Sequence, residues 1–379
     1  MFDVVIIGAG FAGSVLAERF ASSGKKILVI ERRQHVAGNC YDEIDANGIL
    51  IHKYGPHLFH TDDAQVWNYL SRFTPWHLYF HHVKAVVDGK PVPIPFNLNT
   101  LHEVFPKILA NKLEAALLKN FDYGKKIPIL ELKKSADADL QFLADFIYEK
   151  IFLHYSEKQW GLSPEKISGA VTARVPIFVG RDDRYFHDRF QAVPKFGYTK
   201  LVENLLDNKN IKLLLNTDFH EVMNLRDEEI FLFGQKFDGR LIYTGQLDEL
   251  FGKKFGSLPY RSLEMHFETV DAENFQSASV VNYPNNFDFT RITEFKKIHP
   301  AQSSRTTILK EFPQNYIAGK NEPYYPIFTD ETRATYEKYF SELAKFKNIT
   351  AVGRLAEYRY YDIDDVVKRA LEIFDALTK

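Results

Sequence analysis

Cysteine, net charge and long apolar runs are all scarce in this sequence. Cys40 is the single cysteine among 379 residues, which excludes intramolecular disulfides, iron–sulfur clusters and cysteine-based zinc sites. Because 48 basic residues face 50 acidic ones, the net charge is −2, and a broad nucleic-acid-binding surface is not expected. No apolar run approaches the roughly 20 residues of a membrane span, and the N-terminal MFDVVIIGAG lacks the basic start of a signal peptide. We therefore expect a cytoplasmic protein of two or three domains that binds neither nucleic acid nor a membrane.

Aromatic residues, in contrast, are abundant. The chain contains 32 Phe, 20 Tyr and 3 Trp residues, which is 15% of its length. Composition alone leaves two interpretations open: an unusually aromatic core, or rings that line a site for flat or sugar-like ligands.

The first forty residues predict a strand, a glycine-rich turn, a helix and a second strand. Residues 3–7 form a short β-branched run, residues 8–13 read GAGFAG, residues 14–20 have a helical pattern, and residues 26–31 form an apolar run that ends in an acid. This order is typical of a dinucleotide-binding unit. A glycine-rich turn in an unrelated α/β domain is the alternative.

Each glycine of the turn has its own expected role. Gly8 allows the tight turn, Gly10 lets the backbone approach a pyrophosphate at the helix N-terminus, and Gly13 lets helix and strand pack closely. Glu31 lies 18 positions after Gly13 and can accept hydrogen bonds from an adenosine ribose. We expect Phe11, in the same turn, to contact the cofactor as well.

The residues after the acid favour FAD over a nicotinamide cofactor. Arg32 beside the acid, followed by Gly38 and Asn39, resembles the extended fingerprint of flavoproteins that have two dinucleotide-binding folds. Ala37 stands where that pattern often has glycine.

Two later segments agree with FAD. A strand over 240–245 contains Thr244 and resembles the strand that returns to the adenosine side of such proteins, and a strand over 349–354 precedes a helix over 362–377. The cofactor domain is therefore expected to be discontinuous in sequence.

The middle of the chain predicts a helical part and then a β-rich part. Helical patterns cover 101–118, 139–155 and 330–346, and a shorter one covers 198–208. Strand patterns lie at 262–268, 279–283, 290–295 and 306–312.

A histidine-rich segment, HKYGPHLFHT, covers residues 52–61. A zinc site would need these histidines on one element, and Gly55-Pro56 prevents a shared helix face. We therefore expect no metal, and interpret the segment as a loop near the cofactor, with packed structural histidines as the alternative.

Several further residues have both a structural and a functional interpretation. Trp160 in EKQWG is either a packed residue at an exposed helix end or a surface for a sugar, and Tyr155 one turn earlier could stack on a base. Arg174 and Arg291 are either halves of salt bridges or a pair that binds a diphosphate. The tyrosine runs at 323–326 and 358–362 are either core or walls of a carbohydrate site.

Taken together, these motifs resemble those of bacterial UDP-galactopyranose mutases. The resemblance rests on GAGFAG with Glu31, HKYGPHLFHT, EKQWG, Arg174, TRITE (290–294), PYYPI (323–327) and GRLAEYRYYD (353–362). They occur in the same order from one end of the chain to the other.

The resemblance implies an α/β fold with a discontinuous Rossmann-like FAD domain, an inserted helical bundle and a twisted antiparallel sheet domain, usually as a homodimer. The expected boundaries are 1–80, 198–250 and 335–379 for the FAD domain, 98–178 for the helical domain with a mobile lid at about 165–180, and 81–97, 179–197 and 251–334 for the sheet domain.

The resemblance also implies residue roles. Trp160 would face the sugar, Tyr155 the uracil, and Arg174 and Arg291 the diphosphate, while His60 would lie beside the flavin. The remaining substrate residues would be Tyr185, Tyr325 and Tyr360, with His81 where Asn is expected. Further cofactor contacts would come from His57, Thr244, Gly353, Arg354, Tyr360, Asp362 and Ile363.

The implied reaction interconverts UDP-galactopyranose and UDP-galactofuranose for cell-surface polysaccharide synthesis, without net redox change. N5 of reduced FAD serves as nucleophile on the anomeric carbon, and NAD(P)H or a reductase would be the reducing partner. A flavin oxidase of the amine-oxidase type, a non-catalytic binding protein and a mutase for UDP-N-acetylgalactosamine are the alternatives. Because His60 is kept where mutases of N-acetylated sugars tend to have Arg, plain galactose is favoured.

Overall fold

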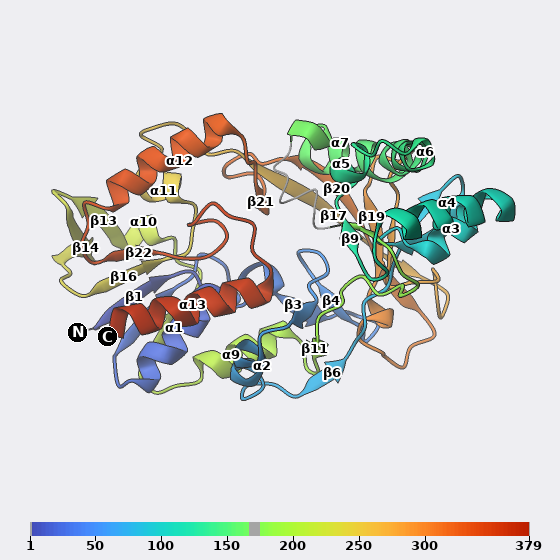
Figure 1. Ribbon diagram of the computed structural model, residues 1–379. Coiled ribbons are helices and arrows are strands. Elements are labelled where there is room, and N and C mark those ends of the chain that lie inside the picture. The colour runs from blue at the N-terminus through green and yellow to red at the C-terminus, as the bar shows by residue number, and fades with distance from the viewer. Residues whose placement is uncertain (1, 167–174, 379) are drawn as a thin grey trace.

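Five parallel strands from separated parts of the chain form one sheet of the computed structural model, which describes residues 2–166 and 175–378 (Figure 1). In spatial order they are β12 (Ile211–Leu214), β2 (Ile27–Ile30), β1 (Val4–Ile7), β16 (Arg240–Tyr243) and β22 (Ile349–Ala351). Strands β1 and β2 are buried along their whole length, which explains their unbroken apolar sequence. The N-terminal motif therefore begins in the centre of the sheet.

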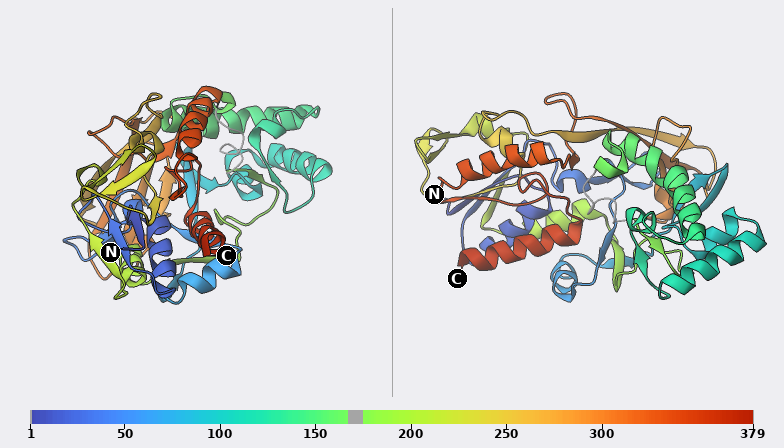
Figure 2. Two further views of the ribbon diagram at one scale, coloured as in Figure 1. Left: turned by 90° about the vertical axis from the view of Figure 1, so that its left-hand side faces the viewer. Right: turned by 45° about the horizontal axis from the view of Figure 1, so that its top comes forward.

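Helices and a small sheet cover both faces of the parallel sheet (Figure 2). On one face, α1 (Phe11–Ser22), α9 (Tyr198–Leu206) and α13 (Ile363–Thr378) share an apolar cluster with β1 and β2. On the other face, α11 (Leu247–Leu250), α12 (Asp330–Leu343), β13 (Met223–Arg226) and β14 (Glu229–Leu232) contribute to a second cluster. The exposed strand β15 (Gln235–Lys236) pairs with β14 and completes this small antiparallel sheet. The expected Rossmann-like α/β arrangement is confirmed.

A seven-stranded sheet extends away from the parallel sheet (Figure 1). Its order is β21 (Tyr325–Pro326), β17 (Tyr260–Val270), β20 (Thr306–Asn315), β19 (Arg291–Glu294), β18 (Val280–Asn282), β7 (Val83–Val87) and β8 (Lys90–Ile94). Neighbouring strands are antiparallel except β18 and β7, which are parallel. The strands expected between 262 and 312 are present, and β17 and β20 are longer than predicted.

The helical part lies at the end of the molecule opposite both termini (Figure 1). It contains α3 (Leu98–Val104), α4 (Lys107–Asn120), α5 (Ile129–Leu132), α6 (Ala138–Ile147) and α7 (His154–Trp160). The single helix predicted over 101–118 is wrong, because Pro106 lacks an amide hydrogen and disfavours helical backbone at Phe105. The helix predicted over 139–155 instead continues through a π-helical turn, Tyr148–Leu153, as far as Trp160.

Smaller elements connect these parts. A three-stranded sheet has the order β5 (Phe59–Thr61), β11 (Phe190–Pro194) and β6 (Trp76–Leu78). Two-stranded sheets join β3 (Asp42–Ile44) to β4 (Leu50–His52) and β9 (Lys126–Ile127) to β10 (Ile177–Phe178), and α2 (Ala64–Leu70) and α10 (Phe219–Val222) are short helices. Within residues 2–166 and 175–378, every helix is too short or too polar to cross a membrane.

Candidate active site

The glycine-rich turn packs too tightly for side chains at two of its three glycines. Gly8 has φ +100°, and a Cβ there would lie 2.1 Å from Thr244 Oγ1. A Cβ at Gly13 would lie 2.0 Å from the Gly8 carbonyl oxygen, so Gly13 is what lets α1 approach the turn. Gly10 is the N-cap of α1, and the nearest atom to a Cβ there is 3.9 Å away. Gly10 therefore faces open space at the positive end of a helix.

Glu31 ties the second strand to this turn. Its Oε2 accepts the Ala9 amide N–H at 2.8 Å, and its Oε1 accepts the Arg33 amide N–H at 2.9 Å. The neighbouring Arg32 and Arg33 both pair with Glu322, at 2.6 and 2.5 Å. The acid is therefore held in place by backbone donors at the rim of the cavity that the turn forms.

A long cavity runs from Glu31 past the glycine turn to the start of α13. The predicted cofactor residues that line it are Gly8, Gly10, Phe11, Glu31, Arg32, Gly38, Asn39, His57, Thr244, Gly353, Arg354, Asp362 and Ile363. Among the described residues, the lining does not include Gly13, which packs against Gly8, or Tyr360, whose neighbour Tyr361 takes that place. Thr217 and Tyr324 also line the cavity and were not predicted.

His57 lies on the wall of this cavity as a neutral imidazole. Its Nδ1 donates to the Gly55 carbonyl at 2.8 Å, so the unprotonated nitrogen is Nε2. Burial and the Arg354 guanidinium lower the pKa of His57 to about 4. Its amide N–H donates to His52 Nδ1 at 3.0 Å, and His52 Nε2 lies 3.3 Å from His299 Nε2. The histidine segment is thus a packed loop beside the cavity, and the described residues include no metal-binding cluster.

His60 lies behind the cavity wall rather than on it. Its Nε2 is 3.9 Å from an oxygen of Asp362, which does line the cavity, and its Nδ1 is 3.2 Å from Asp188 Oδ2. Its ring stacks on Phe186, with centroids 3.6 Å apart. Although burial opposes it, the Asp188 and Asp362 carboxylates raise the pKa of His60.

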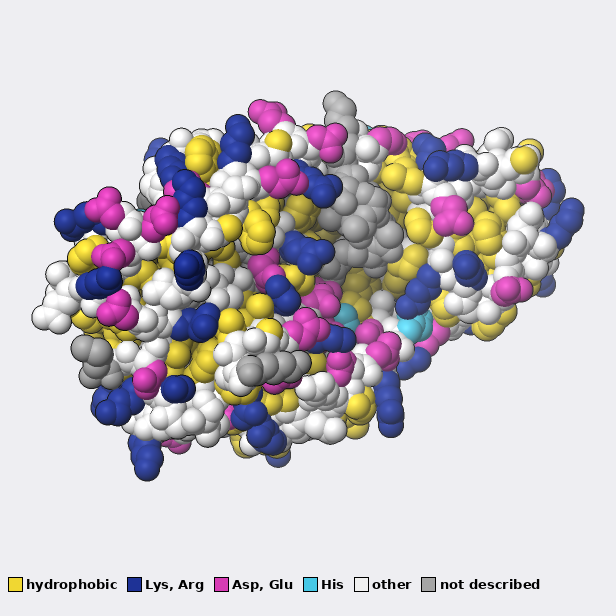
Figure 3. Space-filling model, turned by 60° about the vertical axis from the view of Figure 1, so that its left-hand side comes forward, with side chains coloured by type: hydrophobic (Ala, Val, Ile, Leu, Met, Phe, Trp, Pro, Cys, Tyr) yellow, Lys and Arg dark blue, Asp and Glu magenta, His cyan; other side chains and the backbone are white. Residues whose placement is uncertain are grey.

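A second cavity contains three of the predicted substrate residues. Tyr155, Trp160 and Tyr185 line it, together with apolar residues of the helical part and Asn282 of β18. Figure 3 shows the surface hollowed beside the helical part, with histidine and acidic side chains at the rim of the hollow.

Trp160 lies against a pair of stacked tyrosines. The rings of Tyr325 and Tyr360 are parallel within 1° with centroids 5.8 Å apart, and the Trp160 ring is 5.6 and 6.4 Å from them. The Arg354 guanidinium lies 5.7 Å from the Tyr325 ring and 5.0 Å from the Tyr360 ring. Arg354 also lines the first cavity and Trp160 lines the second, so the rings of Tyr325 and Tyr360 lie between residues of the two cavities.

The end of α7 is fixed in a way that orients Trp160. Gly161 takes φ +70° after the last helical residue, a conformation that favours glycine. Lys158 Nζ donates to the carbonyls of Tyr283, Phe287 and Phe289, at 2.5, 3.0 and 3.1 Å. Arg261 donates to the carbonyls of Gln159 and Lys158, at 2.9 and 3.0 Å. The end of α7 is therefore anchored to the β-rich part, with Trp160 half-buried against the two tyrosines.

Arg291 is held by a buried acid on the neighbouring strand. Its Nε donates to Glu311 Oε1 at 2.6 Å, and the Glu311 side chain is 1% exposed. Glu311 raises the pKa of Arg291 even though burial opposes it. Glu311 Oε2 has no hydrogen-bond partner among the described residues. Arg174 and half of the predicted lid, residues 167–174, lie outside the described residues.

His81 is buried away from the two cavity walls described above. Its Nδ1 is 3.1 Å from Tyr79 Oη and 3.4 Å from Ser279 Oγ, and its ring stacks on Phe186 at 5.9 Å. Burial and the Arg291 charge lower the pKa of His81 to about 3. The described residues therefore show His81 packed behind the site, as a neutral ring.

Sequence reasoning missed the residues that support the site. These are Lys158, Arg261, Asp188, Phe186 and Glu311. Lys158 lies inside the EKQWG motif, so its charge next to a predicted ligand surface was an available signal. The others lie in segments without a motif, and their partners are distant in sequence.

Comparisons with known proteins identify the family. A profile of UDP-galactopyranose mutases matches residues 150–360, more than half of the chain, and a profile of NAD(P)-binding Rossmann-like domains matches residues 6–73. The chain is 35% identical to a probable UDP-galactopyranose mutase of Klebsiella pneumoniae, over 98% of this chain and 94% of that protein. It belongs to the UDP-galactopyranose mutase family. It is also 33% identical to the dTDP-fucopyranose mutase of Escherichia coli, over 98% of this chain and 97% of that protein. The chain is therefore an enzyme of the isomerase class.

The fold of this mutase-family chain also occurs outside the family. A crystal structure of reduced UDP-galactopyranose mutase matches with a TM-score of 0.76 at 16% identity and covers 100% of this chain and 95% of that one. A variant of putrescine oxidase matches with a TM-score of 0.60 at 11% identity, over 99% and 98%. These structural matches show the fold alone, and this fold occurs in both a mutase and an oxidase.

Proposed function

We propose that this chain interconverts UDP-α-D-galactopyranose and UDP-α-D-galactofuranose with reduced FAD as its cofactor. The observation that carries the proposal is a chain of contacts between two cavities: Arg354 of the first lies over the rings of Tyr325 and Tyr360, and these rings contact Trp160 of the second. One cavity begins at a dinucleotide-binding turn, and the other presents Trp160, Tyr155 and Tyr185. An isomerase that uses a dinucleotide cofactor on a nucleotide sugar requires this combination.

The first cavity fits FAD in shape and chemistry. Gly10 leaves room for a pyrophosphate at the N-terminus of α1. Glu31 at the rim accepts two backbone hydrogen bonds and keeps lone pairs for a ribose. At the far end, His57 offers Nε2 as an acceptor. Gly353 also lies at this end, with φ +101°, and a Cβ there would lie only 3.1 Å from Ala12 Cβ. The flavin ring would lie at this end, beside Arg354 and Asp362.

The second cavity supplies groups for UDP and the sugar. Tyr155 would stack on the uracil, and Trp160 would cover the sugar face. Arg291, with Arg174 from the predicted lid, would bind the diphosphate, assisted by the hydroxyl groups of Tyr185, Tyr325 and Tyr360. Because Glu311 holds the Arg291 guanidinium on one edge, the free edge is available for phosphate oxygens.

These roles divide the chemistry between cofactor and protein. Reduced FAD supplies a nucleophilic nitrogen, N5, for the anomeric carbon of the sugar, and the reaction leaves no net redox change. Arg291 and Arg174 would stabilise the negative charge that grows on UDP as it leaves. Exclusion of water around Trp160 would protect the activated sugar from hydrolysis.

The decisive experiment uses the flavin-loaded protein reduced with dithionite. After incubation with UDP-galactofuranose, chromatographic separation of the nucleotides is expected to show UDP-galactopyranose, and oxidised protein is expected to show none. Absence of product with the reduced protein would refute the proposal. Parallel assays with UDP-N-acetylgalactosamine and with dTDP-fucopyranose, the sugar nucleotide named for the Escherichia coli relative, define the preferred substrate. Oxygen consumption with an amine would instead support an oxidase.

A further inference from the structure

His60 is enclosed by two carboxylates and one aromatic ring. Asp188 Oδ2 lies 3.2 Å from Nδ1, and Asp362 Oδ2 lies 3.9 Å from Nε2. Phe186 stacks on the ring at 3.6 Å, and the His60 side chain is 13% exposed. His60 Nδ1 and Asp188 Oδ2 are within ion-pair distance, but their orientation is not that of a hydrogen bond. Each ring nitrogen therefore faces a negative charge.

A neutral imidazole fits this enclosure poorly. It carries one N–H group, so the lone pair of its other nitrogen would point at a carboxylate. The imidazolium carries an N–H on both nitrogens and pairs with both acids. The other titratable neighbours either raise the pKa of His60 as well or carry no charge. Asp364 at the start of α13 also raises the pKa of His60. His81, whose ring also stacks on Phe186, is neutral because its pKa is lowered to about 3.

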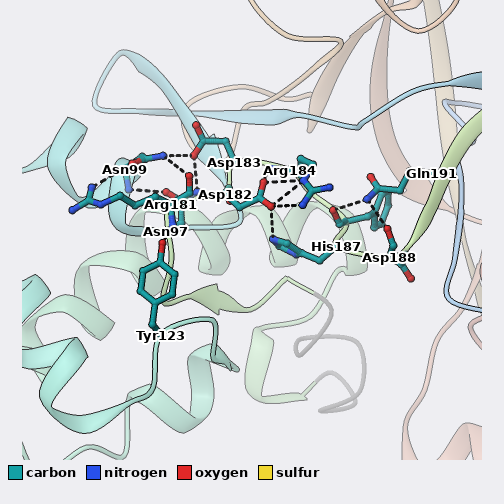
Figure 4. A network of polar contacts seen from close by, with 11 residues as sticks. Asn97, Asn99, Tyr123, Arg181, Asp182, Asp183, Arg184, His187, Asp188 and Gln191 are labelled. Carbon is teal, nitrogen blue, oxygen red and sulfur yellow. Dashed lines mark hydrogen bonds and ion pairs between the residues drawn. The ribbon is translucent and has the colours of Figure 1, made fainter.

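The segment before β11 fixes the position of Asp188 (Figure 4). Gln191 is paired with His60 across β11 and β5, and its Nε2 donates to the carbonyls of Asp188 and Phe186, at 2.9 and 3.2 Å. Arg189 donates its amide N–H to Asp62 at 2.8 Å. The backbone that carries the acid and the stacking ring is therefore anchored to the strand that carries His60.

At its other end, the same segment is anchored to the helical part. Arg181 binds Glu114 of α4 at 2.7 Å, and Asp183 accepts hydrogen bonds from Asn97 and Asn99, at 3.0 and 2.9 Å. Figure 4 shows the contacts of Asp183 with Asn97 and Asn99 at one end of this segment and the contact of Gln191 with Asp188 at the other.

We propose that Asp188 is a positioning residue that keeps His60 as an imidazolium, so that Asp362 stays paired with a cation at the wall of the cofactor cavity. Loss of Asp188 would leave a neutral His60, so that the positive charge next to Asp362 at that wall is lost. Loss of a positive charge near the cavity disfavours electron uptake by a bound flavin. This use of His60 rests on the proposed function, but the charge assignment does not.

The test is an NMR titration of the histidine rings in the oxidised, flavin-loaded protein, with His60 assigned from a His60→Gln variant. In Asp188→Asn the midpoint of His60 is expected to fall by about one pH unit or more, since an opposite charge at this distance shifts a pKa by roughly 1–3 units. Asp188→Glu is expected to restore much of the midpoint. Asp182→Asn is the matched control, because Asp182 lies on the same segment and pairs with Arg184. It is expected to leave His60 unchanged.

The outcomes separate this inference from the proposed function. An unchanged His60 midpoint in Asp188→Asn, with the other twelve of the 13 histidines at their native shifts, would overturn it. A fall of the midpoint equal to that in Asp182→Asn would also overturn it. The second measurement is the flavin reduction potential at pH 7, which is expected to fall in Asp188→Asn and not in Asp182→Asn. Neither measurement uses a sugar nucleotide, so a protein without mutase activity still tests the charge on His60.

Discussion

Substitution of Gly13 by alanine is expected to separate α1 from the glycine turn. The added Cβ would lie 2.0 Å from the Gly8 carbonyl oxygen and 3.1 Å from Ile6 Cγ2. Since real contacts of this kind stay above 3.0 Å, the helix has to move by about 1 Å relative to the turn. Ten of the 12 residues of α1 are buried, so the movement disturbs its packing against α9 and α13. Overpacking of this kind costs roughly 1–3 kcal/mol and occasionally more, and we expect about 3 kcal/mol here because the clash is with backbone.

The assay combines thermal unfolding of the flavin-free protein with the flavin content of the purified protein. Gly10→Ala is the matched control, because its Cβ meets no protein atom closer than 3.9 Å but projects at the cavity. Gly10→Ala is expected to keep the unfolding temperature and to lose flavin, whereas Gly13→Ala is expected to lower both. Flavin-free Gly13→Ala that unfolds at the wild-type temperature would refute the packing argument for Gly13.

Two further substitutions test the site and its strain. Lys158→Met removes the donor from three carbonyls, each hydrogen bond being worth roughly 1 kcal/mol. We expect UDP binding to weaken at least about tenfold by calorimetry, because the end of α7 that carries Trp160 loosens. Lys150→Met, which loses ion pairs with Asp88 and Glu149, is the control, and equal affinities in the two variants would contradict this role. Ala37→Gly is expected to raise stability in thermal unfolding by roughly 0.5–1 kcal/mol. The left-handed conformation of Ala37 at φ +71° costs roughly 1–2 kcal/mol, from which about 0.5–1 kcal/mol of glycine entropy is subtracted. A lower unfolding temperature of Ala37→Gly would contradict the estimate that the left-handed backbone at residue 37 costs more than the added entropy of glycine.

The parts of the fold that were predictable from sequence depend on local requirements. The tight approach of Gly8 and Gly13 can be satisfied by no other residue type, so the pattern GAGFAG determines the turn wherever a strand precedes it. The apolar runs of β1 and β2 likewise follow from burial on both faces. The break between α3 and α4 was also a local matter, and Pro106 was sufficient reason to predict it.

The supporting contacts of the site were not predictable, because they join residues that are far apart in the chain. Arg261 holds a carbonyl of α7 that lies 102 positions away, and His60 meets Asp188 and Asp362 through strand pairing and the start of α13. An arginine or an aspartate alone does not indicate its partner. The resemblance suggested where His60 lies relative to the flavin but contained nothing about the acid on its other side.

The abundance of rings in this chain has two separate causes. Trp67 and Trp76 stack on each other and on Phe190 and Phe59, away from both cavities, so they serve packing. At the site the rings supply polar groups without charge. This matters because, in the proposed complex, a chain with net charge −2 binds a diphosphate next to several acids. Burial raises the pKa of Tyr155, and it raises that of Tyr325 to about 12, so both phenols stay protonated and can donate hydrogen bonds without adding charge. In the proposed complex, the arginines then balance the diphosphate, and the tyrosines position it at no cost in net charge.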